Sequence, residues 1–216
     1  MPPGVTTLLG PLLLALPAWL LLVVALRHGR RDLAATGIAV WALVMMGGLP
    51  VAEKLSPGFC SRIAPGAGSY ASSMLDWAET GDGCESTPSC FIPQQLWHAA
   101  VFVVATVATA GLGGLYVAGI LFSWMGAYSA GLAAMSSSPA TAVLLAWHPW
   151  AVVRVAAYIA LGVVLAEPLA RRGLPPLPNR RAWLFAGGIG LLLDILLKLA
   201  FASSYWRLAI HPLLVR

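Results

Sequence analysis

The sequence predicts an all-α protein, a polytopic membrane bundle of about six transmembrane helices. Hydrophobic residues make up 59% of the 216 residues and charged residues only 10%, against about a quarter charged in ordinary soluble domains. In addition, several stretches reach the roughly 20 apolar residues that a helix needs to cross the hydrocarbon core. We therefore expect residues 1–216 to form a single integral membrane domain.

The first two spans lie on either side of a basic run. Residues 8–26 form the first apolar stretch, and the basic run at residues 27–31 follows it directly. The second stretch covers residues 33 to about 51 and is expected to end near Pro50. Because cytoplasmic loops are enriched in Lys and Arg, the basic run is predicted to lie in the cytoplasm and the N-terminus outside.

Residues 53–96 form a polar segment that we expect to be an extracytoplasmic loop. It carries five acidic and two basic side chains, and it contains all three cysteines, Cys60, Cys84 and Cys90. An oxidising compartment outside the cytoplasm would allow a disulfide there. The pair Cys84 and Cys90 is the expected disulfide, with Cys60 either unpaired or pairing in place of one of them.

The apolar stretch at residues 97–134 contains no Asp, Glu, Lys or Arg. At about 1.5 Å per residue it would overshoot a single crossing almost twofold, so it is expected to hold the third and fourth spans. We place the break near residues 122–124, which gives a third span of about 97–121 and a fourth that starts at Met125. The glycine-rich residues 111–114 are the competing break.

The fifth and sixth spans flank a second basic cluster. Residues 147–150, with two tryptophans typical of a membrane interface, lead into a fifth span that runs to Ala170. Residues 171–181 then supply four arginines in a proline-rich link, and the sixth span covers 182 to about 203. The predicted protein is thus a multi-pass protein of the cell membrane, with both arginine clusters inside and both termini outside.

Four ionisable side chains fall inside the predicted spans, where each is costly and needs a partner. They are Arg154, Glu167, Asp194 and Lys198. Glu167 lies four residues before Arg171, and Asp194 lies four residues before Lys198. This spacing places both members on one helix face, so it predicts an ion pair within each helix.

A sharper hypothesis gathers His148, Arg154, Asp194 and Lys198 into one polar cluster, because the fifth and sixth spans run antiparallel. Such a cluster could bind an anionic headgroup or relay protons. An ion network that only locks two helices together would give the same pattern, so the sequence leaves both interpretations open.

The sequence carries no recognisable catalytic or cofactor motif. It has no His/Glu pair at the spacing of helical zinc sites, no Cys-x-x-Cys, no phosphate-binding glycine loop and no Gly-x-Ser-x-Gly. A membrane enzyme acting on lipid or peptide is therefore the least favoured class of function, and we predict no cofactor and no metal site. The basic residues fall between apolar stretches rather than on one face, so the expected partners are membrane lipids and other envelope membrane proteins, not nucleic acid.

Over residues 97–206, about half of the chain, the order of features resembles the stage II sporulation protein M family of bacterial and archaeal membrane proteins. The shared features are a long apolar helix from Trp97, a small-residue turn at residues 123–128, a histidine that opens the next span at His148, and a last helix rich in small residues. The family usually has a glycine and a carboxylate where this chain has Pro149 and Val152. The resemblance implies a non-enzymatic membrane partner in envelope or cell-wall remodelling.

Two functions follow as hypotheses. The first is a non-enzymatic scaffold or assembly partner in the cell envelope, which the absence of catalytic motifs favours. The alternative is a transporter for a small solute or ion that uses the cluster of Arg154, Asp194 and Lys198 as its polar path.

Overall fold

The structure is a computed structural model that describes residues 3–214 of the chain. Every element in this part of the chain is helical. Six of the helices are long and apolar enough to cross a membrane. The predicted fold class is confirmed: the chain is a multi-pass integral membrane protein built as an all-α bundle.

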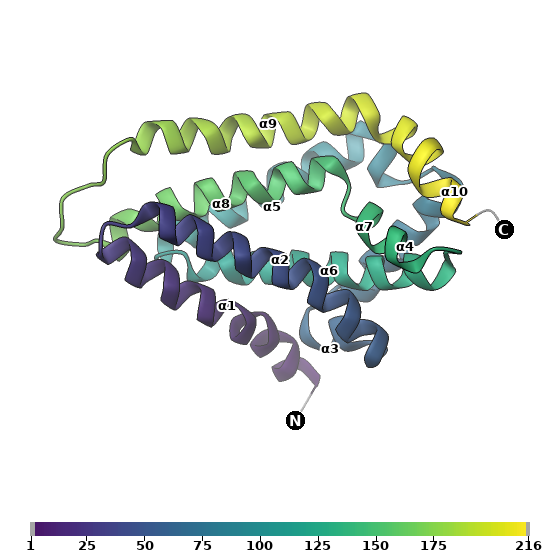
Figure 1. The fold of residues 1–216 in the computed structure, drawn as a ribbon, viewed down its shortest axis with the longest axis horizontal. Helices are drawn as coiled ribbons and strands as arrows, with labels where there is room; N and C mark the ends of the chain where they lie inside the picture. The colour runs from purple at the N-terminus through teal and green to yellow at the C-terminus, as the bar shows by residue number, and fades with distance from the viewer. Residues whose placement is uncertain (1–2, 215–216) are drawn as a thin grey trace.

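The helices run up and down through one elongated bundle (Figure 1). The six spanning helices are α1 (Pro3–Arg27), α2 (Arg31–Leu55), α5 (Pro88–Ala108), α6 (Leu112–Met135), α8 (Pro149–Ala170) and α9 (Arg180–Tyr205). The shorter elements are α3 (Phe59–Ile63), α4 (Ala67–Thr80), η1 (Cys84–Ser86), α7 (Pro139–Ala146), η2 (Trp206–Ile210) and α10 (His211–Leu214).

The connections between spans fall at two ends of the bundle (Figure 1). Residues 28–30, 109–111 and 171–179 lie at one end, which we call the arginine end because both arginine clusters meet there. Residues 56–87 and 136–148, with the C-terminal elements, lie at the other end, which we call the loop end. The alternation of spans predicted from sequence therefore agrees with the arrangement of the helices.

The break between the third and fourth spans lies at residues 109–111, so the predicted break near residues 122–124 is wrong. Ala110 and Gly111 both have positive φ, 50° and 96°, and this reverses the chain between α5 and α6. The Thr109 hydroxyl accepts a hydrogen bond from the Gly113 N–H at 2.6 Å and so satisfies a donor in the first turn of α6. The competing glycine-rich break is the correct one, and the number of spans is unchanged.

The second span does not end at Pro50, because α2 continues through this proline to Leu55. Beyond it, both oxygens of Glu53 accept backbone hydrogen bonds at 2.7 Å, from the N–H groups of Gly58 and Cys60. These bonds hold the start of α3 against the end of α2. The polar segment at residues 53–96 is thus largely helical, since α3, α4 and the first turns of α5 lie within it.

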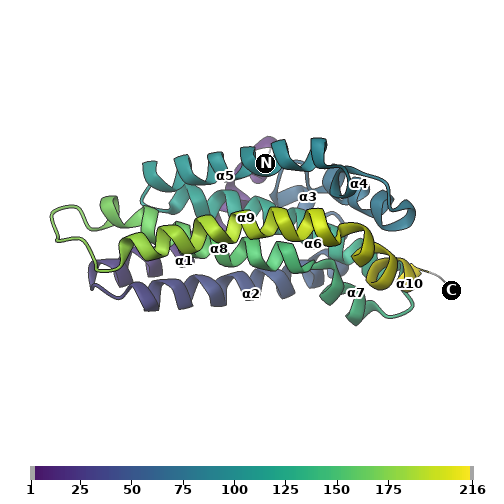
Figure 2. The same cartoon turned by 90° about the horizontal axis from the view of Figure 1, so that it is seen from above.

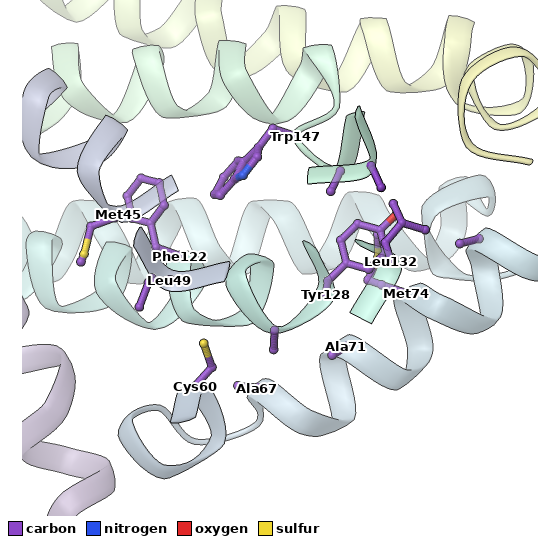
Figure 3. Close-up of a cluster of buried hydrophobic side chains, with 14 of the residues drawn as sticks. Met45, Leu49, Cys60, Ala67, Ala71, Met74, Phe122, Tyr128, Leu132 and Trp147 are labelled. Atoms are coloured by element: carbon purple, nitrogen blue, oxygen red, sulfur yellow. The ribbon is translucent and has the colours of Figure 1, made fainter. Parts of the chain in front are cut away.

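Helix α6 lies at the centre of the bundle, where it packs against α1, α2, α4, α5 and α7. Figure 3 shows the buried side chains that meet around its loop-end half, where Phe122 and Tyr128 of α6 face Leu49 of α2, Met74 of α4 and Trp147. Burial of these large apolar groups anchors the short helices at the loop end to the spanning bundle. Phe122 and Trp147 of this core also line a pocket of the bundle.

Helix α9 lies on the outside of the bundle, over α8 and with α5 to one side (Figure 2). Only 17% of its apolar window is buried, against 44% for α8. Gly187 and Gly190 form its contact with α8: a Cβ on Gly190 would lie 2.8 Å from the Cβ of Ala157. Small residues of this kind let two helix backbones approach closely in a membrane, so α9 is held along one side only.

Candidate functional site

The charged residues in the spans find partners on other elements rather than on their own helix. Arg154 of α8 forms a two-pronged ion pair with Asp194 of α9, in which Nε donates to Oδ2 at 2.8 Å and Nη2 donates to Oδ1 at 3.1 Å. The Asp194 side chain is 2% exposed. The predicted pair of Asp194 with Lys198 is therefore wrong.

Lys198 is paired with Glu85, a residue that the sequence reasoning did not select. Its ammonium lies 2.8 Å from Oε2 of Glu85 and is 2% exposed, and it sits 4.4 Å from the centre of the Phe91 ring. Glu85 belongs to η1, next to Cys84. Helical spacing cannot indicate this pair, because Glu85 and Lys198 lie on different elements. The signal in the sequence that could have identified Glu85 is its position beside a cysteine just before a span.

Glu85 is ionised at neutral pH. Burial is the largest influence and by itself would raise the pKa of its carboxyl, but the charge and hydrogen bond of Lys198, together with the nearby Arg154 and His148, leave the pKa below its ordinary value. A disulfide between Cys84 and Cys90 closes the short loop that carries Glu85. This loop places the Glu85 carboxylate beside Lys198 of α9.

Cys60 is free and buried, and it does not pair with either of the other cysteines. Burial, reinforced by the negative charge of Glu53, raises the pKa of its thiol to about 12. The thiolate, which is the reactive form of cysteine, is therefore scarce at neutral pH. Cys60 acts as a small core residue.

A pocket lies beside the two ion pairs, in the loop-end half of the bundle. It encloses about 670 Å³, counting the open space at its mouth, and we call it the polar compartment. Its polar lining is Glu85, Gln94, Gln95, His98, Arg154 and Lys198, and its aromatic lining is Tyr70, Phe122, Trp124, Trp147 and Tyr158.

Several polar atoms in this lining have no hydrogen-bond partner among the described residues. Gln95 is 8% exposed, yet neither its Oε1 nor its Nε2 makes a hydrogen bond, and the same is true of the indole Nε1 of Trp147. A buried polar group without a partner costs about 1–3 kcal/mol. The polar compartment therefore presents donors and an acceptor that suit the polar atoms of a ligand.

A second pocket adjoins the first on the side of the arginine end. It measures about 440 Å³, counting the open space at its mouth, and four residues line both pockets, namely Ala118, Phe122, Val155 and Tyr158. The rest of its wall is apolar apart from Thr106, whose hydroxyl is occupied by the carbonyl of Phe102 at 2.6 Å. We call this pocket the apolar compartment.

A third opening, which we call the slot, lies between α5 and α9. It measures about 350 Å³, counting the open space at its mouth, and Gln95, His98, Arg154 and Tyr158 line both the slot and the polar compartment. Leu96, which also lines it, is 59% exposed on the outer surface of the bundle. The slot thus lies between the polar compartment and the outer side of the bundle.

His148 was predicted to join the charged cluster, but among the described residues its side chain makes no hydrogen bond or ion pair with either of the two pairs. It is stacked on Trp150 with ring centres 4.8 Å apart, and the rings of Trp77, Tyr128 and Tyr205 surround it. Burial lowers the pKa of His148 to about 4, despite the opposing charge of Glu85. His148 is therefore a neutral residue of an aromatic core at neutral pH.

Glu167 pairs with Arg31 rather than with Arg171, so this prediction is also wrong. One oxygen of Glu167 accepts from the Arg31 guanidinium, and the other accepts from the backbone N–H of Leu177 at 2.7 Å. Helix α8 ends at Ala170, which leaves Arg171 outside the helical register that the spacing rule assumes. Arg171 donates instead to the backbone carbonyl of Leu26.

Of the four residues predicted to form one cluster, the structure brings together three, Arg154, Asp194 and Lys198, and adds Glu85. The pocket next to them is built largely from residues that carried no signal in the sequence, such as Gln95 and Trp147. No family model, no curated protein and no solved structure matches this chain. The chemistry of the site is therefore inferred from its own residues.

Proposed function

We propose that this membrane protein binds a single membrane amphiphile, with the headgroup in the polar compartment and the hydrocarbon chain in the apolar compartment. The observation that carries the proposal is that the two compartments lie side by side, with Ala118, Phe122, Val155 and Tyr158 lining both. A molecule that fills both must be polar at one end and apolar at the other.

The dimensions support a ligand that lies along the membrane normal. Gly111, directly before α6, lines the far end of the apolar compartment, and Met125 of α6 lines the polar compartment. At 1.5 Å per residue these positions are about 21 Å apart, which is roughly two thirds of the 30 Å hydrocarbon core. The polar compartment then lies toward one membrane surface, where the headgroup of an amphiphile belongs.

The slot between α5 and α9 is the proposed route of entry. A lipid diffuses in the plane of the membrane, and the slot opens on the face of the bundle that meets lipid. Because α9 is fastened along α8 and by the pairs Arg154–Asp194 and Lys198–Glu85, its other edge is the side on which a chain can pass.

The same geometry bears on the two functions predicted from the sequence. A polar solute or an ion that left the polar compartment would meet the apolar wall formed by residues such as Leu22, Ile38 and Leu115. Desolvation against such a wall is costly, so the geometry favours binding of an amphiphile over transport of an ion. The scaffold role and the resemblance to the sporulation family remain predictions.

Binding is tested with a plug at the junction of the two compartments. The probe is monooleoylglycerol, titrated against the purified protein and counted as bound molecules by native mass spectrometry. The wild type is expected to take up one molecule saturably, and Ala118→Phe is expected to weaken binding at least about tenfold, because the phenyl ring separates the headgroup site from the chain site.

The matched control is Ala186→Phe, which adds the same ring at an exposed position of α9 outside both compartments. Thermal unfolding of both variants, with Ala118→Leu as a smaller plug, separates loss of the pocket from loss of the fold. Equal binding by the wild type and a folded Ala118→Phe protein would rule the proposed site out.

We also infer that the arginine end faces the cytoplasm, since both basic clusters gather there. In a Cys60→Ala background, cysteines introduced singly at the exposed positions Arg30, Thr80 and Pro176 report the orientation without disturbing the native disulfide. Only the Thr80→Cys protein is expected to react with a membrane-impermeant thiol reagent in intact cells. Labelling at position 30 or 176 would reverse the orientation.

A further inference from the structure

Every formal charge in the wall of the polar compartment is matched by an opposite charge within hydrogen-bonding distance. Arg154 is bound to Asp194 at 2.8 and 3.1 Å, and Lys198 is bound to Glu85 at 2.8 Å. The two cations and two anions therefore cancel, and the compartment presents no net charge to a ligand.

An anionic headgroup would meet cations whose charges are already neutralised by carboxylates of the protein. Lys198 is 2% exposed and lies between Glu85 and the Phe91 ring, so a phosphate could reach it only by displacing the carboxylate. Removing one partner from a buried ion pair is strongly destabilising. The displaced carboxylate of Glu85 would also remain next to the incoming anion and repel it.

The groups that do lack partners are almost all uncharged. Oε1 of Gln95 can accept a hydrogen bond, while its Nε2 and the Nε1 of Trp147 can donate, and all three are buried without partners among the described residues. A hydroxyl group both donates and accepts, so it can satisfy both ends of the Gln95 amide. The guanidinium of Arg154 adds Nη1, which neither bond to Asp194 uses.

The remaining wall is aromatic and suits a weakly hydrated group. Tyr70 and Trp124 are stacked with ring centres 5.3 Å apart, and both line the compartment with Trp147. A hydroxylated headgroup can leave water for this wall if its hydroxyl groups bond to Gln95, because a buried hydroxyl needs a hydrogen-bond partner. A phosphate loses far more hydration in the same place.

We propose that the amphiphile bound by this protein carries an uncharged, hydroxyl- or amide-bearing headgroup, and that lipids with an anionic headgroup bind poorly. This inference rests on the proposed function and names the class of ligand for the same pocket. The alcohol or amide of the headgroup bonds to Gln95, while the two ion pairs stay closed beside it.

The test compares two probes that differ by one phosphate, monooleoylglycerol and oleoyl lysophosphatidic acid. Each is titrated separately against the purified wild-type protein, and bound molecules are counted by native mass spectrometry. The uncharged probe is expected to bind at least about tenfold more tightly than the anionic one. Equal or tighter binding of lysophosphatidic acid overturns the inference but leaves the proposed binding site intact.

A charge variant tests the cause of the preference. Asp194→Asn keeps the shape of the side chain but leaves Arg154 unmatched, and arginine cannot lose its charge in a protein. The ratio of the two affinities is expected to move toward the anionic probe by about tenfold. In the matched control, Arg154→Gln with Asp194→Asn, the compartment is neutral again and the preference for the uncharged probe returns.

The outcomes separate the two proposals. If neither probe binds the wild type saturably, the proposed function fails together with the inference. If both bind and Asp194→Asn leaves the ratio unchanged, the charge balance does not select the headgroup and the inference alone fails. If a variant does not fold, the ratio measured on the wild-type protein still decides.

Discussion

Replacing Asp194 with leucine is expected to lower the free energy of unfolding by about 3–5 kcal/mol. The substitution leaves the partly buried guanidinium of Arg154 at the interface of α8 and α9 without the carboxylate that holds it by two hydrogen bonds. Because arginine stays charged, its desolvation is then uncompensated. Unfolding of the purified protein in detergent micelles, followed by circular dichroism against denaturant, measures the loss.

Two double variants identify the partner of Asp194. Arg154→Leu with Asp194→Leu removes both charges of the observed pair and is expected to recover most of the loss, since an apolar pair often replaces a buried ion pair without cost. Asp194→Leu with Lys198→Leu removes the pair that the helical spacing predicts. It leaves Arg154 and Glu85 both unmatched, so it is expected to be less stable than either single variant.

The contrast between these double variants is decisive for the cross-helix pairing. If the Asp194/Lys198 double variant is as stable as the wild type, the two residues neutralise each other on α9 and the pairing in the structure is wrong. The same result would remove the charge balance on which the preference for an uncharged headgroup depends.

Replacing Glu167 with leucine is expected to lower the free energy of unfolding by a similar amount, about 3–5 kcal/mol. The side chains of Glu167 and Arg31 are 4% and 8% exposed, so the variant leaves a buried arginine without its carboxylate. It also removes the acceptor for the N–H of Leu177, which ties the link at residues 171–179 to α8. Denaturant unfolding in micelles measures this loss as well.

A double-mutant cycle distinguishes the two arginines near Glu167. The coupling energy between Glu167 and Arg31 is expected to be about 2 kcal/mol, and that between Glu167 and Arg171 close to zero. Arg171 is the control because it lies in the same region but donates to backbone carbonyls, including that of Pro175 at 2.9 Å. The reverse order of couplings would restore the pair predicted from the helical spacing.

Hydropathy predicted that a turn exists between α5 and α6 but not where it lies. The apolar stretch is long enough for two crossings, so its length alone predicted that a turn exists. Its position depends on which residues can adopt positive φ, as Ala110 and Gly111 do. Phe122 and Ser123, at the predicted break, are instead buried within α6. Ser123 can lie inside the helix because its hydroxyl donates a hydrogen bond to the carbonyl of Gly119 at 2.8 Å.

Hydropathy along the chain is enough to predict the all-α membrane fold and its six spans, because apolar length and residue composition are properties of each stretch taken alone. The partners of the charges depend on how the helices pack against one another. The i to i+4 spacing rule considers only neighbours on one face of the same helix. A guanidinium, however, pairs most strongly with a carboxylate that accepts from it with both oxygens. For Arg154 that carboxylate is Asp194 on another helix, and for Lys198 the partner is Glu85 in a loop far away in the sequence. The pocket likewise is lined by residues from α4, η1, α5, α6, α8 and α9, so no single stretch of residues could predict it.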